Sequence, residues 1–314
     1  MGKGIMLGKR MGVHPRIRAY GAVVPAMIFF ALSFVWFKVA NESYGPLTII
    51  FFRLVLSSVL LFGFIRVTRQ LVLPQRRDIP LILLLGFFEP FLYFMFESYG
   101  LQLLSSTVGA VIISLIPLVS PLAAYLFLQE RVYWRHIVCV VISLLGVTLI
   151  VVERGSGMTA SGLGIALQFG AVCAGVAYTV VLQKIPLRLN TLSIILYQNV
   201  VGAILFVPLW GVFEFRRFVD TPADYDGLLA ILKLAIVVST MAYILFSYSV
   251  RRLGINRANM FTNVIPVCTA LFAWLILGDT LSLQNALGIA VVIGSLYLAE
   301  RIRVKEPAAI VQGG

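Results

Sequence analysis

Long apolar segments alternate with short polar ones along nearly the whole chain. Each apolar segment holds roughly twenty residues, the length that an α-helix needs to cross a hydrocarbon core of about 30 Å. The pattern therefore predicts an all-α integral membrane protein with ten transmembrane helices. The predicted spans are residues 20–40, 46–66, 79–99, 105–127, 134–152, 162–183, 191–213, 228–250, 255–277 and 283–300.

The fourth and ninth predicted spans are copies of one pattern. A shift of 149 positions (266 − 117) places Pro117 on Pro266 and Glu130 on Asp279. A period of this length in a chain of 314 residues indicates two halves of one design.

Each half contains five predicted spans, an odd number, so the second half must enter the membrane from the opposite side. Inverted repeats of this kind surround a central site in many secondary transporters. A larger bundle without a transport function is the plainer alternative. The predicted domains are a basic cytoplasmic N-terminal tail (1–19), a first repeat (20–154), a linker (155–161), a second repeat (162–303) and a cytoplasmic C-terminal tail (304–314).

Composition agrees with a membrane protein, since 60% of the residues are hydrophobic and 12% are charged. The net charge of +12 could indicate nucleic-acid binding, but most Lys and Arg lie in short loops between the spans. Nineteen of the 25 basic residues fall on the side that holds the N-terminus. The positive-inside rule then predicts a multi-pass protein of the cell (inner) membrane with both termini in the cytoplasm.

The cysteines offer no sign of a metal or redox centre. All three, Cys139, Cys173 and Cys268, lie inside apolar segments, where packing is their usual role. No spacing typical of a zinc, haem or iron–sulfur site is present, so we expect no metal and no cofactor.

The third span carries two carboxylates. Glu89, Tyr93 and Glu97 follow each other at four-residue intervals, which places them on one face of a helix. A carboxylate inside a bilayer is costly unless it is paired or faces water, so such residues often mark a substrate or proton pathway. The alternative is a buried hydrogen bond with a tyrosine or an arginine.

Further polar residues lie in other spans. Asn259 and Asn263, one helical turn apart, and Ser114 in the matching fourth span could line the same cavity or join helices by hydrogen bonds. Arg53 lies some seven residues inside the second span. Its side chain could snorkel to the outer interface, pair with Glu89 or Glu97, or contact an anionic substrate.

Two groups of residues have expected mechanical roles. Pro117, Pro121 and Pro266 are expected to bend helices that must move, since a proline removes one helical hydrogen bond. Glu130 and Asp279 close the fourth and ninth spans, and we expect them to fix the helix ends rather than bind a ligand.

In these features the chain resembles the drug/metabolite transporter superfamily, in particular its EamA-type transporters. The motifs are the proline and the closing acid of each fourth helix, Arg53 in FFRLVLSS and the tyrosine-rich AYILFSYSVRRLG at 242–254. The resemblance covers residues 20 to 303, and it implies ten helices in two repeats. The chain departs from the family pattern at Ala31-Leu32-Ser33, where Trp-Gly-Ser is common, and in the two carboxylates of its third span.

The resemblance implies a small-molecule transporter for metabolites, amino acids or drugs. It would export its cargo by alternating access, rocking its two repeats about a site between spans 1, 3, 4, 6, 8 and 9. Its partners would be the substrate and the lipid bilayer, with protons as a further partner if transport is proton-coupled; facilitated diffusion without coupling is the alternative. A nucleotide-sugar or lipid-intermediate translocator is the alternative. A nucleotide-sugar translocator should have basic residues inside its spans near the membrane midplane, and only Arg53 comes near that position. A membrane-embedded transferase would need clustered His, Asp or Ser at a membrane face.

Overall fold

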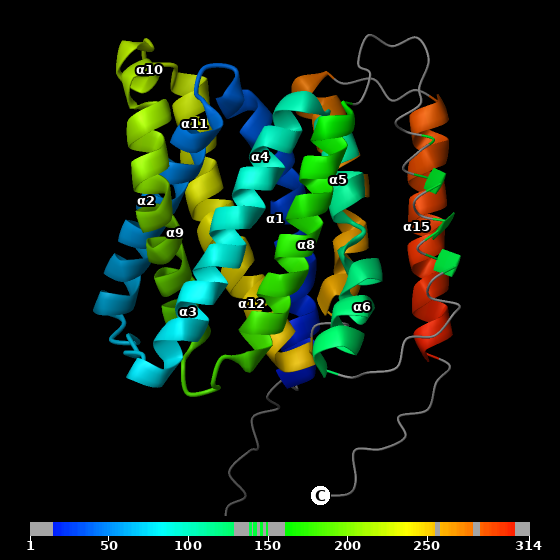
Figure 1. Ribbon diagram of the computed structural model, residues 1–314, viewed down its shortest axis with the longest axis horizontal. Coiled ribbons are helices and arrows are strands. Elements are labelled where there is room, and N and C mark those ends of the chain that lie inside the picture. Colours follow the sequence, from blue (N-terminus) through cyan, green and yellow to red (C-terminus); the bar gives the residue numbers. More distant parts are fainter. Residues whose placement is uncertain are drawn as a thin grey trace, which may run out of the picture.

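The computed structural model describes nearly all of the predicted spans except the fifth (Figure 1). All regular structure in the described part of the chain is helical. Glu130, Asp279 and most of the fifth predicted span lie outside the described residues. Those residues are 15–128, 138–139, 141–142, 145–146, 149, 161–254, 258–278 and 283–304.

The first half forms four membrane-crossing segments within the described residues, two of which are interrupted. Their helical elements are α1 (Pro15–Asn41), α2 (Pro46–Val67), η1 (Arg76–Asp78), α3 (Ile79–Gly86), η2 (Phe87–Leu92), α4 (Tyr93–Leu103), α5 (Ser106–Ile113) and α6 (Ile116–Leu128).

The second half follows the same plan. Its elements are α8 (Gly162–Lys184), α9 (Thr191–Phe213), α10 (Phe215–Asp220), α11 (Tyr225–Lys233), η3 (Leu234–Ala242), α12 (Tyr243–Leu253), η4 (Met260–Asn263), α14 (Val264–Phe272), η5 (Ala273–Leu277) and α15 (Leu283–Val304).

Seven helical stretches of the described residues are long and apolar enough to cross a membrane. They match the first four predicted spans and the sixth to eighth. The ninth and tenth predicted spans are also helical within the described residues. Their apolar helices, Phe261–Leu277 and Ala286–Ser295, are shorter than the seven stretches that could cross a membrane.

Helix α2 begins with an unusual cap. Its N-cap residue, Gly45, has no side chain to bind the free N–H groups of the first turn. Glu214, from the end of α9 in the other half, supplies the carboxylate instead and accepts from the N–H groups of Leu47 and Thr48 at 3.1 and 2.7 Å. A Cβ at position 45 would lie 2.4 Å from that carboxylate, so the contact requires glycine.

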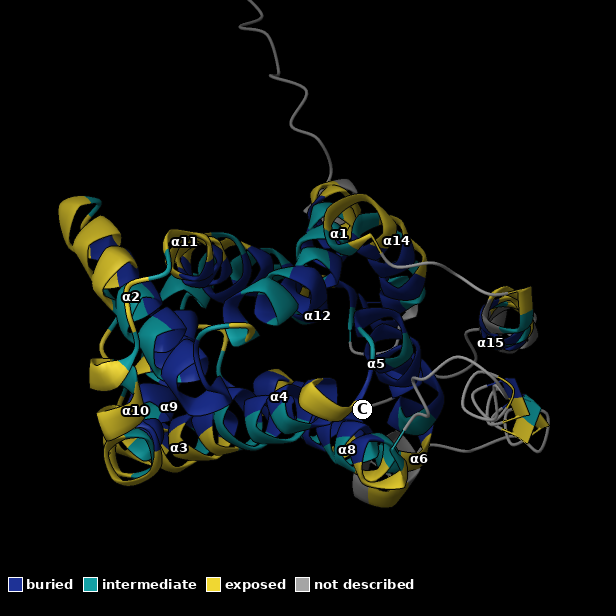
Figure 2. Ribbon diagram, turned by 90° about the horizontal axis from the view of Figure 1, so that it is seen from above, coloured by how far each residue is buried: buried dark blue, intermediate teal, exposed yellow. Residues whose placement is uncertain are grey.

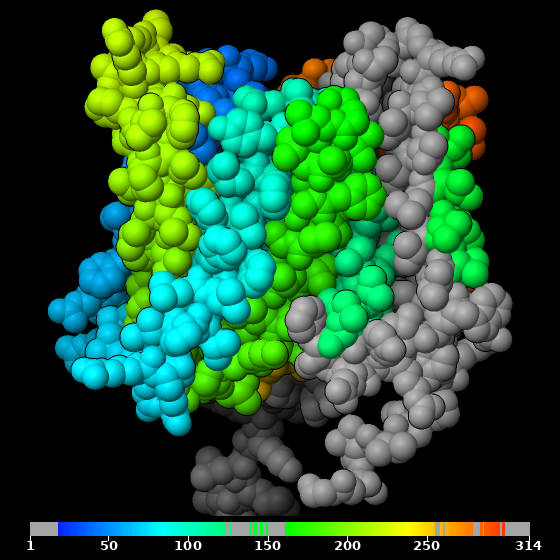
Figure 3. All heavy atoms as spheres, viewed as in Figure 1, coloured from blue at the N-terminus to red at the C-terminus, as the bar shows by residue number. Residues whose placement is uncertain are grey.

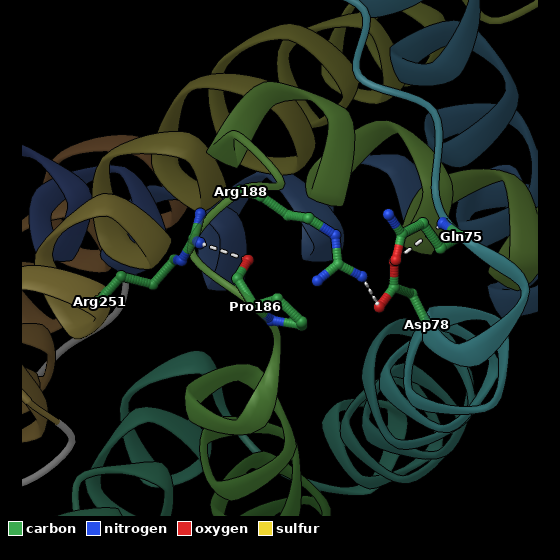
Figure 4. A network of polar contacts seen from close by, with 5 residues as sticks. All are labelled: Gln75, Asp78, Pro186, Arg188 and Arg251. Atoms are coloured by element: carbon green, nitrogen blue, oxygen red, sulfur yellow. Dashed lines mark hydrogen bonds and ion pairs between the residues drawn. The ribbon is translucent and has the colours of Figure 1, made fainter.

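Polar contacts at each end of the bundle show which loops lie together. At the upper end in Figure 1, Ser43 donates to the carboxylate of Asp224. At the lower end, Arg188 pairs with Asp78, and Arg251 donates to the carbonyl of Pro186 (Figure 4). These contacts place the end of α1 with the start of α11, and the start of α3 with the ends of α8 and α12.

The corresponding helices of the two halves therefore run in opposite directions. Helix α1 and the α3–η2–α4 segment run from the lower to the upper end in Figure 1. Their counterparts in the second half, α8 and the α11–η3–α12 segment, run from the upper to the lower end. Glu214 at the end of α9 caps the start of α2, so these two helix ends lie together. Helix α2 therefore descends from the upper end in Figure 1, whereas α9 ascends to it.

The helices pack into two bundles that each mix the two halves. We call α1, α11–η3–α12 and α14 the first bundle, because α1 packs against all the others. The second bundle consists of α8 with α3–η2–α4 and α5–α6, and Figure 3 shows α4 and α8 side by side on its surface. In Figure 2 the two bundles face each other, with α2 and α9 packed together at one side.

Irregular turns interrupt the helices midway through each bundle. The third span contains the π-helical η2, in which Glu89 has extended backbone angles (φ −149°, ψ 118°). A shift of 149 positions places this segment within η3, which is also π-helical. The fourth span is broken between α5 and α6, just before Pro117, and its counterpart contains the 3₁₀ turn η4 just before Pro266. Backbone breaks of this kind are tolerated in a membrane where protein covers them.

Gly202 allows α9 to approach the break in the third span. A Cβ at this position would lie 2.2 Å from Cγ of Pro90, a ring atom that cannot rotate away. We expect Gly202→Ala to destabilise the protein by about 1–3 kcal/mol through overpacking and to lower its thermal unfolding midpoint in detergent.

Gly211→Ala is the matched control, because it lies on the same helix with no atom within 4 Å of the added Cβ. An unchanged or raised midpoint is expected there, since alanine is the better helix former. Equal midpoints for the two variants would contradict the close packing of α9 on η2.

Candidate functional site

A cavity lies between the two bundles and is lined by residues from both halves. Its volume is about 50 Å³, which is room for a few water molecules. The six spans that were predicted to surround a substrate site, spans 1, 3, 4, 6, 8 and 9, all contribute to the lining of this cavity, and α2 joins them through Arg53. The lining residues are Phe30, Ser33, Phe34, Arg53, Glu89, Tyr93, Phe94, Glu97, Ile113, Ile116, Gly175, Thr179, Val238, Tyr243, Phe246, Asn259, Thr262 and Ile265.

The third span presents its two carboxylates to this cavity. Glu89 and Glu97 are both 6% exposed, and Tyr93 lies between them in sequence. The hydroxyl of Tyr93 donates to Oε1 of Glu97 at 3.0 Å, which is the i, i+4 contact expected on one helix face. Glu89 lies outside the regular helix, and its carboxylate accepts from the hydroxyl of Tyr243 in the opposite bundle. Both carboxylates thus combine a place in the cavity wall with a hydrogen bond to tyrosine.

Arg53 does not snorkel to the interface, and that alternative is wrong. Its side chain is 2% exposed and lines the cavity, because η3 and α4 cover it on both sides. Nε donates to Oγ of Ser239 at 2.9 Å, and the guanidinium lies 4.2 Å from the ring centroid of Phe94. No carboxylate oxygen of the described residues lies within 4.0 Å of it, so a direct ion pair with Glu89 or Glu97 is also absent from this structure.

A buried polar network supports Arg53 from behind. Nδ2 of Asn199 donates to the carbonyl of Ser239 at 3.2 Å and to Oγ of Ser57 at 2.9 Å. Ser57 in turn shares a hydrogen bond with Thr240 at 2.6 Å. These contacts join α2, α9 and η3, so they fix the helix turn that holds Nε of Arg53.

The other predicted residues are divided between the cavity and the packing around it. Asn259 lines the cavity and donates through Nδ2 to Oγ of Ser120 at 2.9 Å. Asn263 and Ser114 are not among the lining residues, so of their two predicted roles, cavity lining and hydrogen bonding between helices, the first is not seen in this structure. The Ser114 hydroxyl is fully buried and donates to the carbonyl of Val111 at 2.6 Å, since the chain turns there between α5 and α6. Asn263 lies at the end of η4, where its Oδ1 is buried without a hydrogen bond.

The three prolines follow the breaks in the fourth and ninth spans along the chain. Pro117 is the second residue of α6, and Pro121 lies one turn further along that helix. Pro266 is buried in α14, directly after η4. This placement agrees with bent helices, while movement at these bends stays a prediction.

Sequence reasoning missed the residues that hold the carboxylates and Arg53 from other helices. Tyr243 was part of the tyrosine-rich motif but had no assigned role, and Ser239 was not considered. Thr179 and Gly175 of α8 line the cavity although the sixth span shows no polar stripe. The available signal for Tyr243 was a tyrosine in the part of the eighth span that corresponds to the middle of the third span. Its partner, Glu89, lies 154 positions away in the sequence.

Among the described residues there is no group of three or more His, Cys, Asp or Glu side chains that could hold a metal ion. The ionisable groups that the cavity wall offers for recognising charge include the carboxylates of Glu89 and Glu97 and the guanidinium of Arg53.

The Tyr93–Glu97 contact is open to a direct test. We expect Tyr93→Phe to lower the thermal midpoint, because a buried carboxylate that loses its donor costs about 1–3 kcal/mol. Tyr99→Phe is the control, since Tyr99 lies on the same helix but is only partly buried. The same loss of stability in both variants would argue against a special role for the hydroxyl of Tyr93.

Comparison with known proteins places the chain among transporters. The EamA-like transporter family matches residues 17–152 and 162–301, which correspond to the two halves. A protein of Archaeoglobus fulgidus named an uncharacterized transporter is 26% identical over 275 residues, covering 88% of this chain and 96% of that protein.

Two relatives have named cargoes. An S-adenosylmethionine/S-adenosylhomocysteine transporter of Chlamydia trachomatis is 28% identical, covering 81% of this chain and 82% of that protein. A probable terminal-alkyne amino-acid exporter of Streptantibioticus cattleyicolor is 25% identical, covering 87% and 91% respectively. One solved crystal structure shares the fold with a TM-score of 0.66 at 16% identity, covering 92% of this chain and 98% of the other. The chain belongs to the EamA-like transporter family.

Proposed function

We propose that this membrane protein exports a small amphiphilic metabolite from the cytoplasm by alternating access. The observation that carries the proposal is the small cavity between two bundles, lined by charged, polar and aromatic side chains from both halves. A volume of about 50 Å³ is too small for a metabolite, so binding and release require the bundles to separate at one end or the other. Secondary transporters with inverted repeats work in this way.

The architecture proposed for this function is ten spans in two inverted five-helix repeats. The opposite directions of the corresponding helices support the inversion, and the apolar segment 134–152 would supply the fifth span. The lower end in Figure 1 would face the cytoplasm, because it carries the basic residues in or after the last turns of α2, α8 and α12. Both termini would then be cytoplasmic, in a cell membrane.

The packing favours the two mixed bundles, rather than the two halves, as the units that move. Helix α1 is packed against α12 and α14 of the second half, and α8 against α4 and α6 of the first. Rocking the halves as rigid bodies would break these interfaces. Moving one bundle against the other preserves them and opens the cavity that lies between.

The cavity and the named relatives together favour a cargo that resembles an amino acid. Both named relatives handle compounds that contain an amino-acid group. Glu89 and Glu97 would bind a cationic amino group or take up the protons that drive export, and the phenylalanines would contact an apolar portion. A nucleotide sugar would need several cations, whereas Arg53 is the single basic residue of this cavity lining. A membrane-embedded transferase gains no support, because the family consists of transporters.

Proton coupling predicts a specific effect of Glu89→Gln. Ligands that raise the thermal midpoint of the purified protein, screened from amino acids, amines and S-adenosylmethionine, would serve as labelled substrates in everted vesicles. An acidic vesicle interior should increase substrate accumulation by the wild type. Glu89→Gln should lose that increase, because an amide does not take up a proton, but should retain exchange without a gradient.

Glu42→Gln is the matched control, since Glu42 is exposed at the end of α1. Accumulation driven by the gradient that persists in a folded Glu89→Gln protein would exclude Glu89 as the coupling group.

Movement of the bundles can be tested by cross-linking. Asn41 of the first bundle and Gln102 of the second are joined by a hydrogen bond of 3.2 Å at the upper end. Cysteines at these two positions, linked by a short bifunctional thiol reagent, should stop transport because that end can no longer open. The native Cys139, Cys173 and Cys268 would first be replaced by serine or alanine.

A second cysteine pair controls for the cross-linking itself. Oγ of Ser43 and Oδ2 of Asp224 are 2.8 Å apart at the same end. Both residues flank helices of the first bundle, because Ser43 follows α1 and Asp224 precedes α11. Linking them should leave transport intact. Full transport with the link between positions 41 and 102 would contradict the movement of one bundle against the other.

A further inference from the structure

We propose that Arg53 is the anion-binding point of the cavity and that it binds a carboxylate on the transported compound. The inference rests on the transporter function proposed above and adds to it which residue recognises which group of the cargo. Four features of the structure carry it: burial, the lack of a direct counterion, the geometry of the remaining donors and the network behind them.

Burial makes the charge of Arg53 expensive. The side chain is 2% exposed in the middle of a membrane protein, where an unpaired guanidinium costs several kilocalories per mole. Buried charges are normally compensated by a direct partner of opposite sign. Within the described residues, the direct contacts of Arg53 are the Ser239 hydroxyl and the Phe94 ring, and both are uncharged.

The carboxylates of the cavity are already engaged. Glu97 accepts from Tyr93 and Glu89 accepts from Tyr243, and neither has an oxygen within 4.0 Å of the guanidinium. The two carboxylates reduce the positive potential around Arg53 from a distance, but they leave its Nη donors without a bound carboxylate. A cargo with a carboxylate could fill this place, and an amino group on the same cargo could approach Glu89 or Glu97.

The geometry of the remaining donors suits a carboxylate. Ser239 occupies Nε, and the ring of Phe94 covers one face of the guanidinium plane at 4.2 Å. The Nη donors remain, and their edge can bind both oxygens of a carboxylate at once. Phe34 and Phe246 belong to the same cavity wall, so the apolar part of the cargo would lie against aromatic rings.

The network behind Arg53 indicates a site that is formed before the cargo binds. Asn199 is 1% exposed and holds both Ser239 and Ser57 by hydrogen bonds. It thereby fixes the π-helical segment whose Ser239 hydroxyl orients the guanidinium. A guanidinium held on one edge and one face loses little conformational freedom on binding, which favours affinity.

The proposal predicts that the carboxylate of the cargo is required for transport. Wild-type protein in proteoliposomes would be offered labelled amino acids and S-adenosylmethionine in counterflow, each paired with its carboxamide or its decarboxylated amine. We expect the acids to be transported at least about tenfold faster than their uncharged or decarboxylated partners, because only a carboxylate can accept both Nη donors as an anion.

Arg53→Gln should abolish this preference, and Arg53→Lys should restore part of it as a point charge without the planar edge. Lys233→Gln is the matched control, since Lys233 is an exposed cation of α11 that lies near Trp36 and does not line the cavity. It should leave the preference for acids unchanged. If Arg53→Gln does not fold, the comparison of acids with amides in the wild type still decides whether a carboxylate is recognised.

The outcomes separate this inference from the proposed function. Equal transport of acids, amides and amines by the wild type would overturn the anion site while confirming transport. A folded Arg53→Gln protein that still prefers acids would overturn the role of Arg53. A wild type that moves none of these compounds faster than empty liposomes would contradict both the anion site and the proposed amino-acid-like cargo.

Discussion

Two carboxylates and one guanidinium are buried in the centre of the described part of this membrane protein, and the arrangement of the helices around them follows from the need to hold each one. Glu97 binds a tyrosine of its own helix, Glu89 binds a tyrosine of the opposite bundle, and Arg53 binds Ser239 and Phe94. Bulk water does not reach these groups inside a bilayer, so protein donors and acceptors must compensate much of their charge. Each contact therefore restricts how α2, the third span and the eighth span can lie relative to one another.

The irregular turns of the helices serve the same requirement. In a continuous α-helix through the third span, Glu89 would lie on the same face as Tyr93 and Glu97. The break at Glu89 instead lets its carboxylate reach Tyr243. The π-helical η3 carries Ser239 at the matching level of the second half. The cavity thus lies where both halves depart from regular helix, and the surrounding helices cover the backbone groups that these breaks expose.

Contacts between the halves shape the molecule as much as contacts within them. Glu214 of the second half caps α2 of the first, and α1 and α8 each pack mainly on helices of the other half. Neither half could form its cavity wall by itself, because each wall combines helices from both. This exchange of helices explains why a duplicated sequence folds as one body around a central cavity rather than as two neighbouring domains.

Local patterns in the sequence were sufficient for seven of the predicted membrane spans, for the duplication and for placing Tyr93 and Glu97 on one helix face. These features depend on hydrophobic length and helical periodicity, which act over a few residues. The burial of Arg53, the pairing of Glu89 with Tyr243 and the cap that Glu214 provides were decided only by the tertiary structure. The bonded partners lie 154 to 186 positions apart, and the sequence contains no local signal for which side chains meet when two halves interlock.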